Sequence, residues 1–297
     1  MKRAIAALLT ILCYPAAAQV ADKPVVLVVS ADAGDYLLAA GGTLAAMIEK
    51  GAVAHVIRVT NDDKDGWDLS PEEAAQRIRV ESEEAARILG VKTVISMGYR
   101  AAELADVPFT SLRDRLMVYI RHYKPAVLFI PNPYTEYDRV LDRYYTGRAA
   151  EDAWRAASLE NYLPPFGAAG LKPHLTPELY YYAQPLDPRR RDPETTATFV
   201  PQPKIIDISE TFDKKLKAVQ ALKTINHSTA MRLKARLDST GRKLPLLNVV
   251  NAASINKLIE ENVRGLAKIA SDSTSFSLAE EFRYAGITYR IPSKYLQ

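Results

Sequence analysis

Two acidic residues stand directly after the first apolar run of the chain. Residues 24–30 read Pro-Val-Val-Leu-Val-Val-Ser, which has the length and β-branched character of a strand buried on both faces. Asp32 and Asp35 follow this run. Carboxylates at a strand end can hold a hard divalent cation, or they can cap the next helix and face its positive end. On this loop alone both interpretations remain open.

A second set of polar and aromatic residues follows a later apolar run, residues 126–130. The set comprises Asn132, Tyr134, Tyr137, Asp142 and Arg143. Amphipathic rings beside hydrogen-bonding groups suit a sugar or another hydroxylated ligand, and ordinary packing is the alternative for the two tyrosines. We therefore expect Asn132, Tyr134 and Tyr137 to contact a ligand that binds in this region.

The order of apolar and amphipathic segments predicts an α/β fold. Strands are expected at 24–30, 53–60, 93–97 and 126–130, and helices at 41–50, 70–90 and 111–123. This alternation with short connections indicates a Rossmann-like, doubly wound, mostly parallel sheet in a three-layer α/β/α arrangement. Ligands of such sheets bind beyond the carboxyl ends of the strands, near the switch in strand order. The site is therefore expected in the loops 31–40, 61–69, 98–109 and 131–142.

The second half of the chain has a less regular pattern. Strands are expected at 178–183 and 204–208, helices at 211–225 and 252–269, and a long loop rich in Pro and Arg at 184–203. The 297 residues, 48% of them hydrophobic, have an ordinary globular composition. We predict a single α/β domain over residues 19–297 that ends in a helical extension.

The N-terminus has the pattern of a secretory signal peptide. Lys2 and Arg3 precede a short apolar run, and small residues at Ala16 and Ala18 are placed for cleavage before Gln19. A first core element is the alternative interpretation of this run. Residues 1–18 are predicted to be a signal peptide, so we expect export to the periplasm or the extracellular space. Cleavage would remove Cys13, the only cysteine, and leave a mature chain without disulfides.

Charge and hydropathy narrow the range of partners. Removal of Lys2 and Arg3 takes the formal net charge from +4 to +2, which gives no electrostatic reason to expect nucleic acid as a partner. After signal cleavage no apolar stretch is long enough to span a bilayer. A small molecule is the expected partner.

The first loop resembles the opening motif of the PIG-L/LmbE family of N-deacetylases. That motif normally reads Ala-His-Pro-Asp-Asp-Glu, then four residues and Gly-Gly. Here residues 31–36 read Ala-Asp-Ala-Gly-Asp-Tyr, and Gly41-Gly42 follow after four residues. Further segments are similar to the family in the same order, namely 59–62, 79–90, 98–104, 125–133, 147–149 and 207–218. The resemblance implies an LmbE-like fold, and it places Arg79 among the residues expected to bind a ligand.

The resemblance also implies zinc chemistry, but this chain departs from the motif that supplies it. In the family, zinc is held by the His and second Asp of the opening motif and by the last His of a later His-x-Asp-His motif, and the first Asp is the general base. Those four positions hold, in that order, Asp32, Asp35, Arg143 and Gly34. A glycine cannot accept a proton, and a guanidinium has no free lone pair for a metal.

We therefore predict that Arg143 replaces the metal and pairs with Asp32 and Asp35, because its planar fork matches carboxylates. No cofactor is then expected. One alternative is an oxygen-only site of Asp32, Asp35 and Asp142, which would suit calcium, magnesium or manganese. The other is zinc, as the resemblance implies.

Three functions are compatible with these residues. The first is a catalytically weakened or inactive family member that binds a sugar-like or acylated ligand. The second is an active, metal-dependent hydrolase of amide bonds with a rearranged site, in which Asp32, Asp35 or Asp138 could act as a base or a ligand. The third is a structural or partner-binding protein that keeps only the fold. The candidate catalytic residues are Asp32, Asp35, Asp142 and Arg143.

Overall fold

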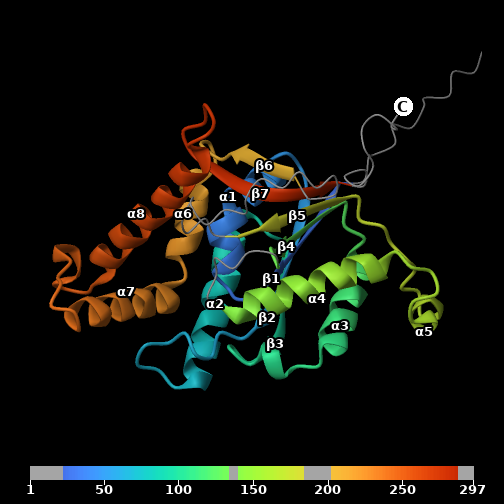
Figure 1. The fold of residues 1–297 in the computed structure, drawn as a ribbon, viewed down its shortest axis with the longest axis horizontal. Helices are drawn as coiled ribbons and strands as arrows, with labels where there is room; N and C mark the ends of the chain where they lie inside the picture. Colours follow the sequence, from blue (N-terminus) through green and yellow to red (C-terminus); the bar gives the residue numbers. More distant parts are fainter. Residues whose placement is uncertain (1–22, 134–139, 184–201, 287–297) are drawn as a thin grey trace, which may run out of the picture.

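The computed structural model describes residues 23–133, 140–183 and 202–286, and Figure 1 shows their arrangement. Seven strands form one sheet in the order β3-β2-β1-β4-β5-β7-β6. β1 to β5 are parallel to one another, and only the pairings of β7 with β5 and β6 are antiparallel. The predicted α/β class with a mostly parallel sheet is confirmed. The predicted signal peptide, residues 1–18, lies outside the described residues.

Strands and helices alternate through the first half of the chain. The strands are β1 (Val25–Ser30), β2 (Val53–Thr60), β3 (Thr93–Tyr99), β4 (Val127–Pro131), β5 (Glu178–Tyr182), β6 (Gln202–Asp207) and β7 (Ala279–Gly286). The helices are α1 (Asp35–Glu49), α2 (Pro71–Leu89), α3 (Phe109–Tyr123), α4 (Leu141–Ala157), α5 (Pro164–Ala168), α6 (Phe212–Gln220), α7 (Lys223–Asp238) and α8 (Ala252–Ser271). Two 3₁₀ turns, η1 (Leu104–Asp106) and η3 (Pro245–Leu247), complete the described elements.

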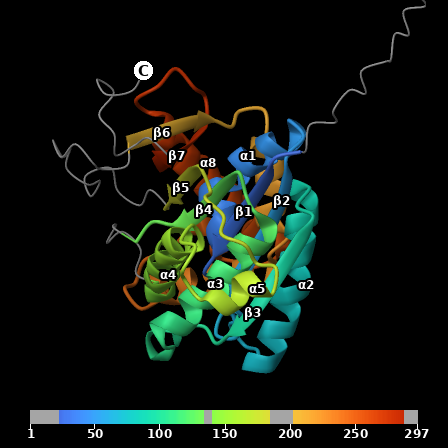
Figure 2. The same ribbon diagram turned by 90° about the vertical axis from the view of Figure 1, so that its right-hand side faces the viewer.

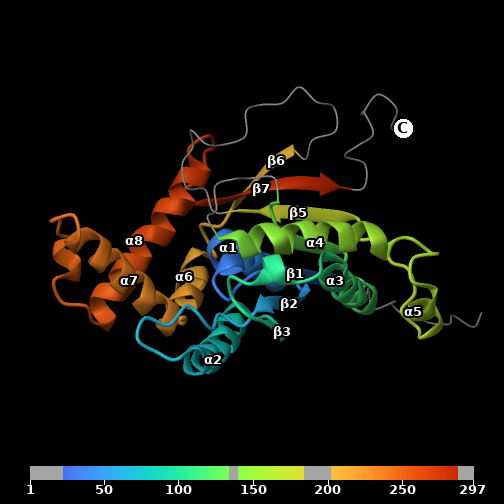
Figure 3. The same cartoon turned by 60° about the horizontal axis from the view of Figure 1, so that its bottom comes forward.

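Alternate residues of the central strands face two separate hydrophobic cores. On β1, Val26 and Val28 pack into the core that α1, α2, α6 and α8 cover. Leu27 and Val29 pack into the core beneath α3 and α4. Figure 2 shows α3 and α4 on one side of the sheet and α2 on the other, and Figure 3 shows α7 and α8 on the α2 side. The uninterrupted apolar run of β1 follows from this burial on both faces.

The structure differs from the sequence-based expectation in several elements. α1 begins at Asp35 rather than at residue 41, because Asp32 Oδ1 accepts the backbone N–H groups of Gly34 and Asp35, at 2.9 and 2.7 Å. The helix expected over 211–225 is two helices, α6 and α7. The chain turns between them at Leu222, and the Thr224 N–H donates to Glu81 of α2.

Two further elements were not predicted from the pattern of the chain itself. β7 contains Glu280, Glu281 and Arg283 and therefore has no apolar run. α4 starts at Leu141, so that Asp142 and Arg143 lie on its first turn and not in a loop. Among the described residues, no helix combines the length and the apolar character that a membrane crossing requires.

The Gly41-Gly42 step of α1 allows the helix to approach the segment after β6. A Cβ atom at Gly42 would lie 2.8 Å from Cβ of Ile208, which is closer than packed carbon atoms come. Ile208 is itself only 1% exposed, so it has little space into which to move. The close packing of α1 on the β6–α6 connection therefore requires glycine at this position.

Gly42→Ala should lower the free energy of unfolding by about 1–3 kcal/mol, the usual cost of overpacking a core. The control is Gly265→Ala in α8, where a Cβ atom meets nothing within 4 Å. That change should leave stability unchanged or raise it by up to about 1 kcal/mol. Urea denaturation of both variants measures the difference, and an equal response at the two sites would contradict the packing argument.

Candidate active site

Arg143 lies between the two carboxylates that follow β1. Its Nε donates to Asp32 Oδ2 at 2.9 Å and lies 3.2 Å from Asp35 Oδ1. The Arg143 and Asp32 side chains are 15% and 17% exposed, whereas that of Asp35 is 2% exposed. The pairing predicted from the sequence is confirmed: a guanidinium bridges the two acids.

The fold brings these residues together at the switch in strand order. β1 lies between β2 and β4, so the connections that leave the carboxyl ends of β1 and β4 meet at one edge of the sheet. α4 packs closely against the end of β4, because a Cβ atom at Gly147 would collide with the Pro131 carbonyl. Gly147 is one helical turn after Arg143, and the close packing therefore places Arg143 over the end of β1.

Each carboxylate has further hydrogen-bonding partners. Asp32 Oδ1 accepts backbone N–H groups at the start of α1, and Oδ2 accepts from Arg143, so the capping interpretation is confirmed for Asp32. Asp35 Oδ2 accepts from the Tyr182 hydroxyl of β5 at 3.2 Å, and this hydroxyl also lies 2.8 Å from the Val29 carbonyl. Burial, followed by the negative charge of Asp35, raises the pKa of Tyr182 well above its ordinary value. Tyr182 therefore keeps its single hydroxyl proton, for which the Val29 carbonyl and Asp35 Oδ2 are both acceptors.

Asp142 points towards a different loop from that of Arg143. Its two carboxylate oxygens accept the backbone N–H groups of Ala102 and Leu104, at 2.5 and 3.2 Å. Burial raises its pKa, and the two N–H bonds lower it in part. Asp142 thus ties the first turn of α4 to the connection after β3. Within the described ranges, no group of three or more His, Cys, Asp or Glu side chains is arranged to hold a metal ion.

The residues predicted to bind a ligand have different surroundings. Arg79 is exposed on α2 and pairs with Glu83 of the same helix at 2.8 Å. Asn132 follows β4, where its backbone N–H donates to the Tyr182 carbonyl at 2.8 Å. Tyr134, Tyr137 and Asp138 lie outside the described residues.

A second buried ion pair, which sequence reasoning missed, lies beneath the first loop. Arg58 Nη1 of β2 is 3.5 Å from Asp62 Oδ2, and these side chains are 3% and 0% exposed. Asp62 Oδ1 accepts the Ala33 N–H at 3.3 Å, so the pair supports the loop that carries Asp32. Burial, and then the charge of Asp32, raises the pKa of Asp62 well above its ordinary value. An Arg near the end of the largely apolar strand β2, four residues before an Asp, was the signal available in the sequence.

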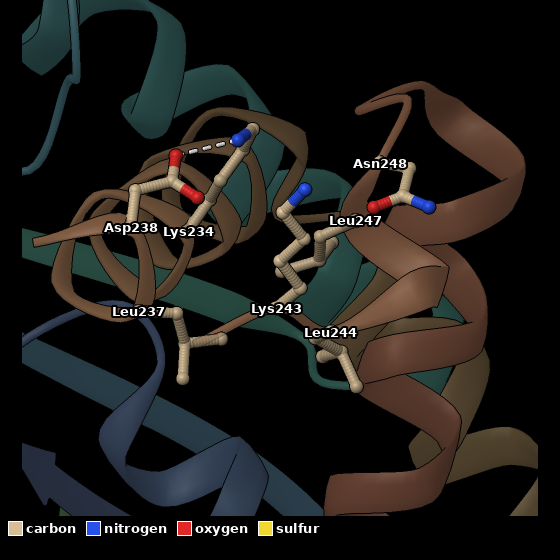
Figure 4. A pocket seen from close by; sticks show the side chains of 7 residues that line it. All are labelled: Lys234, Leu237, Asp238, Lys243, Leu244, Leu247 and Asn248. Carbon is tan, nitrogen blue, oxygen red and sulfur yellow. Dashed lines mark hydrogen bonds and ion pairs between the residues drawn. The ribbon is translucent and has the colours of Figure 1, made fainter. Parts of the chain in front are cut away.

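A cavity of about 160 Å³ lies elsewhere, between the end of α7 and η3 (Figure 4). Lys234, Leu237, Lys243 and Asn248 are among the residues that line it. The dashed line in Figure 4 marks the ion pair between Lys234 and Asp238. None of the residues predicted to bind or react lines this cavity.

The fold and the arrangement around Arg143 define an α/β protein with a candidate site at the switch point of its sheet. Residues 27–154 match the sequence model of the family PIG-L, GlcNAc-PI de-N-acetylase. This segment of the chain is therefore similar in sequence to that family.

Comparisons with individual proteins agree with this assignment. A diacetylchitobiose deacetylase from Thermococcus kodakarensis is 26% identical over 203 residues, which are 67% of this chain and 69% of that protein. The structure is similar to N,N'-diacetylchitobiose deacetylase from Pyrococcus horikoshii, with a TM-score of 0.69, 23% identity and coverage of 91% of this chain and 87% of that one. It is also similar to GalB, the 4-carboxy-2-hydroxymuconate hydratase of Pseudomonas putida KT2440. For GalB the TM-score is 0.60, the identity 19%, and the coverage 88% and 96%. The two structural matches show the fold.

The donor groups of this site do not fit the zinc that the family resemblance implies. Of the three positions that hold zinc in the family pattern, two are carboxylates here and the third is Arg143. A guanidinium offers no lone pair, and its Nε is already bonded to the same carboxylates that would have to bind the ion. A cation at that place would meet the positive charge of Arg143.

Arg143→Met should lower the free energy of unfolding at neutral pH by about 2–4 kcal/mol, because two carboxylates would be left without their cation. The estimate is below the range for fully buried pairs because Arg143 and Asp32 keep some exposure. The control is Arg79→Met, which removes an exposed pair with 54% and 53% exposed side chains and should cost less than about 1 kcal/mol. Chemical denaturation checks both values, and equal costs would refute a central role for Arg143.

Stability should also depend on pH through Asp65, in the loop after β2. Burial, and then the negative charge of Asp32, raises the pKa of Asp65. The folded state therefore holds this proton more tightly than the unfolded state does. The stability that protonated Asp65 contributes is therefore fully present below the unfolded-state pKa of this carboxyl. It is lost as pH rises through the folded-state pKa.

Asp65→Asn should accordingly gain stability relative to the parent protein between about pH 3 and about pH 7. Thermal unfolding at several pH values measures this trend. Asp68→Asn, an exposed position in the same loop, is the control and should show a flatter pH dependence. If the stability difference between Asp65→Asn and the parent protein did not change with pH, this interpretation would be contradicted.

Proposed function

We propose that the protein binds a sugar-like, N-acylated small molecule at the carboxyl edge of its sheet, and that it does so without zinc. The observation that carries the proposal is the position of Arg143 Nε, 2.9 Å from Asp32 and 3.2 Å from Asp35. A side-chain cation stands where the family pattern has a metal ligand. The base position of that pattern is Gly34, which has no proton acceptor in its side chain.

The relatives support the class of ligand. The two similar deacetylases are named for diacetylchitobiose, and the Pyrococcus structure contains an inhibitor. In this chain the carboxyl edge of the sheet presents the carboxylate of Asp32 and the guanidinium of Arg143, which are 17% and 15% exposed. Such groups form directional hydrogen bonds with hydroxyl and amide groups of a ligand. A ligand that binds here would form its polar contacts with the Asp32–Arg143 ion pair and not with a metal.

The same site also defines what the protein would not do efficiently. Hydrolysis of an amide in the family pattern needs a base and an electrophilic metal. The described carboxylates nearest the pattern are engaged: Asp35 with Arg143 and Tyr182, and Asp142 with two backbone N–H groups. We therefore propose a binding protein derived from a deacetylase fold. Export, through residues 1–18, is part of the same proposal and rests on the sequence pattern alone.

The direct test is calorimetric titration of the purified protein with N,N'-diacetylchitobiose, alongside zinc analysis and an assay for released acetate. Binding that is unchanged by a chelator, with no acetate release, is the expected result. Stoichiometric zinc, together with acetate release that the chelator abolishes, would show an active hydrolase with a rearranged site. No binding of the sugar would instead favour a protein that keeps the fold for another partner.

Restoring the family residues should restore a metal site. The variant Asp32→His/Gly34→Asp/Arg143→His should bind about one zinc ion per chain, since three protein ligands define an open zinc site. Space for the new Asp exists, because a Cβ atom at Gly34 would meet only Asp32 and Leu222, at 3.6 and 3.7 Å. The control, Asp32→His/Gly34→Asp, keeps Arg143 and should bind zinc much more weakly. Equal zinc binding by the two variants would show that Arg143 does not block the site.

A further inference from the structure

A buried ion pair holds the middle of α1. Lys215 of α6 and Glu280 of β7 are 2.7 Å apart, and each side chain is 2% exposed. The two residues are 65 positions apart in the sequence and come from α6 and β7, which both contact α1. The pair lies outside the candidate site, and neither residue contacts Asp32 or Arg143 in any described interaction.

The pair bonds to backbone groups of α1 that normally bond to each other. Glu280 Oε1 and Oε2 accept the N–H groups of Gly42 and Thr43, at 2.9 and 2.8 Å. Lys215 Nζ donates to the Leu38 carbonyl at 2.7 Å. In a regular helix the Gly42 N–H would donate to the Leu38 carbonyl. Here each of these two groups has a charged partner from another element.

The Gly41-Gly42 step makes this approach possible. A Cβ atom at Gly41 would lie 3.3 Å from Cγ of Lys215, so a larger residue would push the lysine away from the helix. The Thr211 hydroxyl adds a bond to the Gly42 carbonyl at 2.8 Å. Four side-chain hydrogen bonds therefore fix α1 between Leu38 and Thr43, over about one and a half helical turns.

The Lys215–Glu280 pair and its bonds to α1, here called the α1 clamp, act on the same helix that begins at the candidate site. α1 begins at Asp35, seven residues before Gly42, or about 10 Å along the helix axis. A helix of this length is stiff, so a shift at Gly42 would be transmitted to Asp35. Buried ion pairs contribute little net stability compared with apolar residues, but they specify one geometry. Their directional bonds suit a positioning role.

We propose that Lys215 and Glu280 are positioning residues, which set α1 so that Asp35 meets Arg143. The inference concerns the geometry of the ion pair and does not require that the site binds a sugar. It predicts thermodynamic coupling between two pairs that share no contact. A purely structural role would give independent, additive effects, because sites so far apart normally do not interact.

The test is a mutant cycle in urea denaturation of the full chain. Arg143→Met is measured in the parent protein and in Lys215→Met/Glu280→Gln. Arg143→Met lowers the folding equilibrium constant by some factor in the parent protein. We expect that factor to be at least about threefold smaller in the Lys215→Met/Glu280→Gln variant. The same loss in both backgrounds would overturn the proposal.

The chain offers a matched control for this cycle. Lys214 and Glu49 also join α6 to α1, at 3.0 Å, but their side chains are 34% and 51% exposed. Lys214→Met/Glu49→Gln should leave the effect of Arg143→Met unchanged. If the buried double variant does not fold, Glu280→Gln alone enters the cycle, because Gln keeps the shape of Glu and one acceptor oxygen. Additivity in that cycle would equally overturn the proposal.

A ligand measurement separates this inference from the proposed function. If the parent protein binds N,N'-diacetylchitobiose, the buried variant should bind it several-fold more weakly and the exposed control variant should not. Equal affinities in the buried variant and the parent protein would count against positioning. If the parent protein binds no sugar, the proposed function fails, and the urea cycle still decides the role of the α1 clamp.

Discussion

The bridging of Asp32 and Asp35 by Arg143 is the interaction on which the carboxyl edge of this sheet depends. Two carboxylates at neighbouring positions in a poorly solvated crevice repel each other strongly unless a cation lies between them. A guanidinium meets that need permanently, since it keeps its proton at any relevant pH. A metal would meet it reversibly and would bring a reactive water as well. In the function that we propose, Arg143 therefore keeps the electrostatic balance of the site without the zinc chemistry that the family resemblance implies.

The surrounding structure is organised to hold this ion pair. Gly147 lets α4 lie against the end of β4, and this close packing carries Arg143 to the site. Tyr182 of β5 places its hydroxyl beside Asp35. The buried pair of Arg58 and Asp62 supports the loop from below through the Ala33 N–H. Several elements thus converge on one small group of charges, and this is why we expect its loss to destabilise the fold.

Similarity of fold and similarity of chemistry separate clearly in this protein. The same architecture occurs in sugar deacetylases and in a hydratase from Pseudomonas putida, so the fold does not determine the reaction. Here Gly34 and Arg143 stand at the base position and at one metal-ligand position of the family pattern, and the proposed binding function rests on these two residues.

The sequence by itself determined the alternation of strands and helices and the meeting of Asp32 and Asp35 with Arg143. Burial on both faces imposes apolar runs on β1 and β4, and parallel strands bring their carboxyl ends to one edge. Only the tertiary structure decided that Asp142 turns to the Ala102 loop, and that the charged strand β7 places Glu280 against α1. The partners of Asp142 and Glu280 come from distant parts of the chain, so no local pattern reveals them.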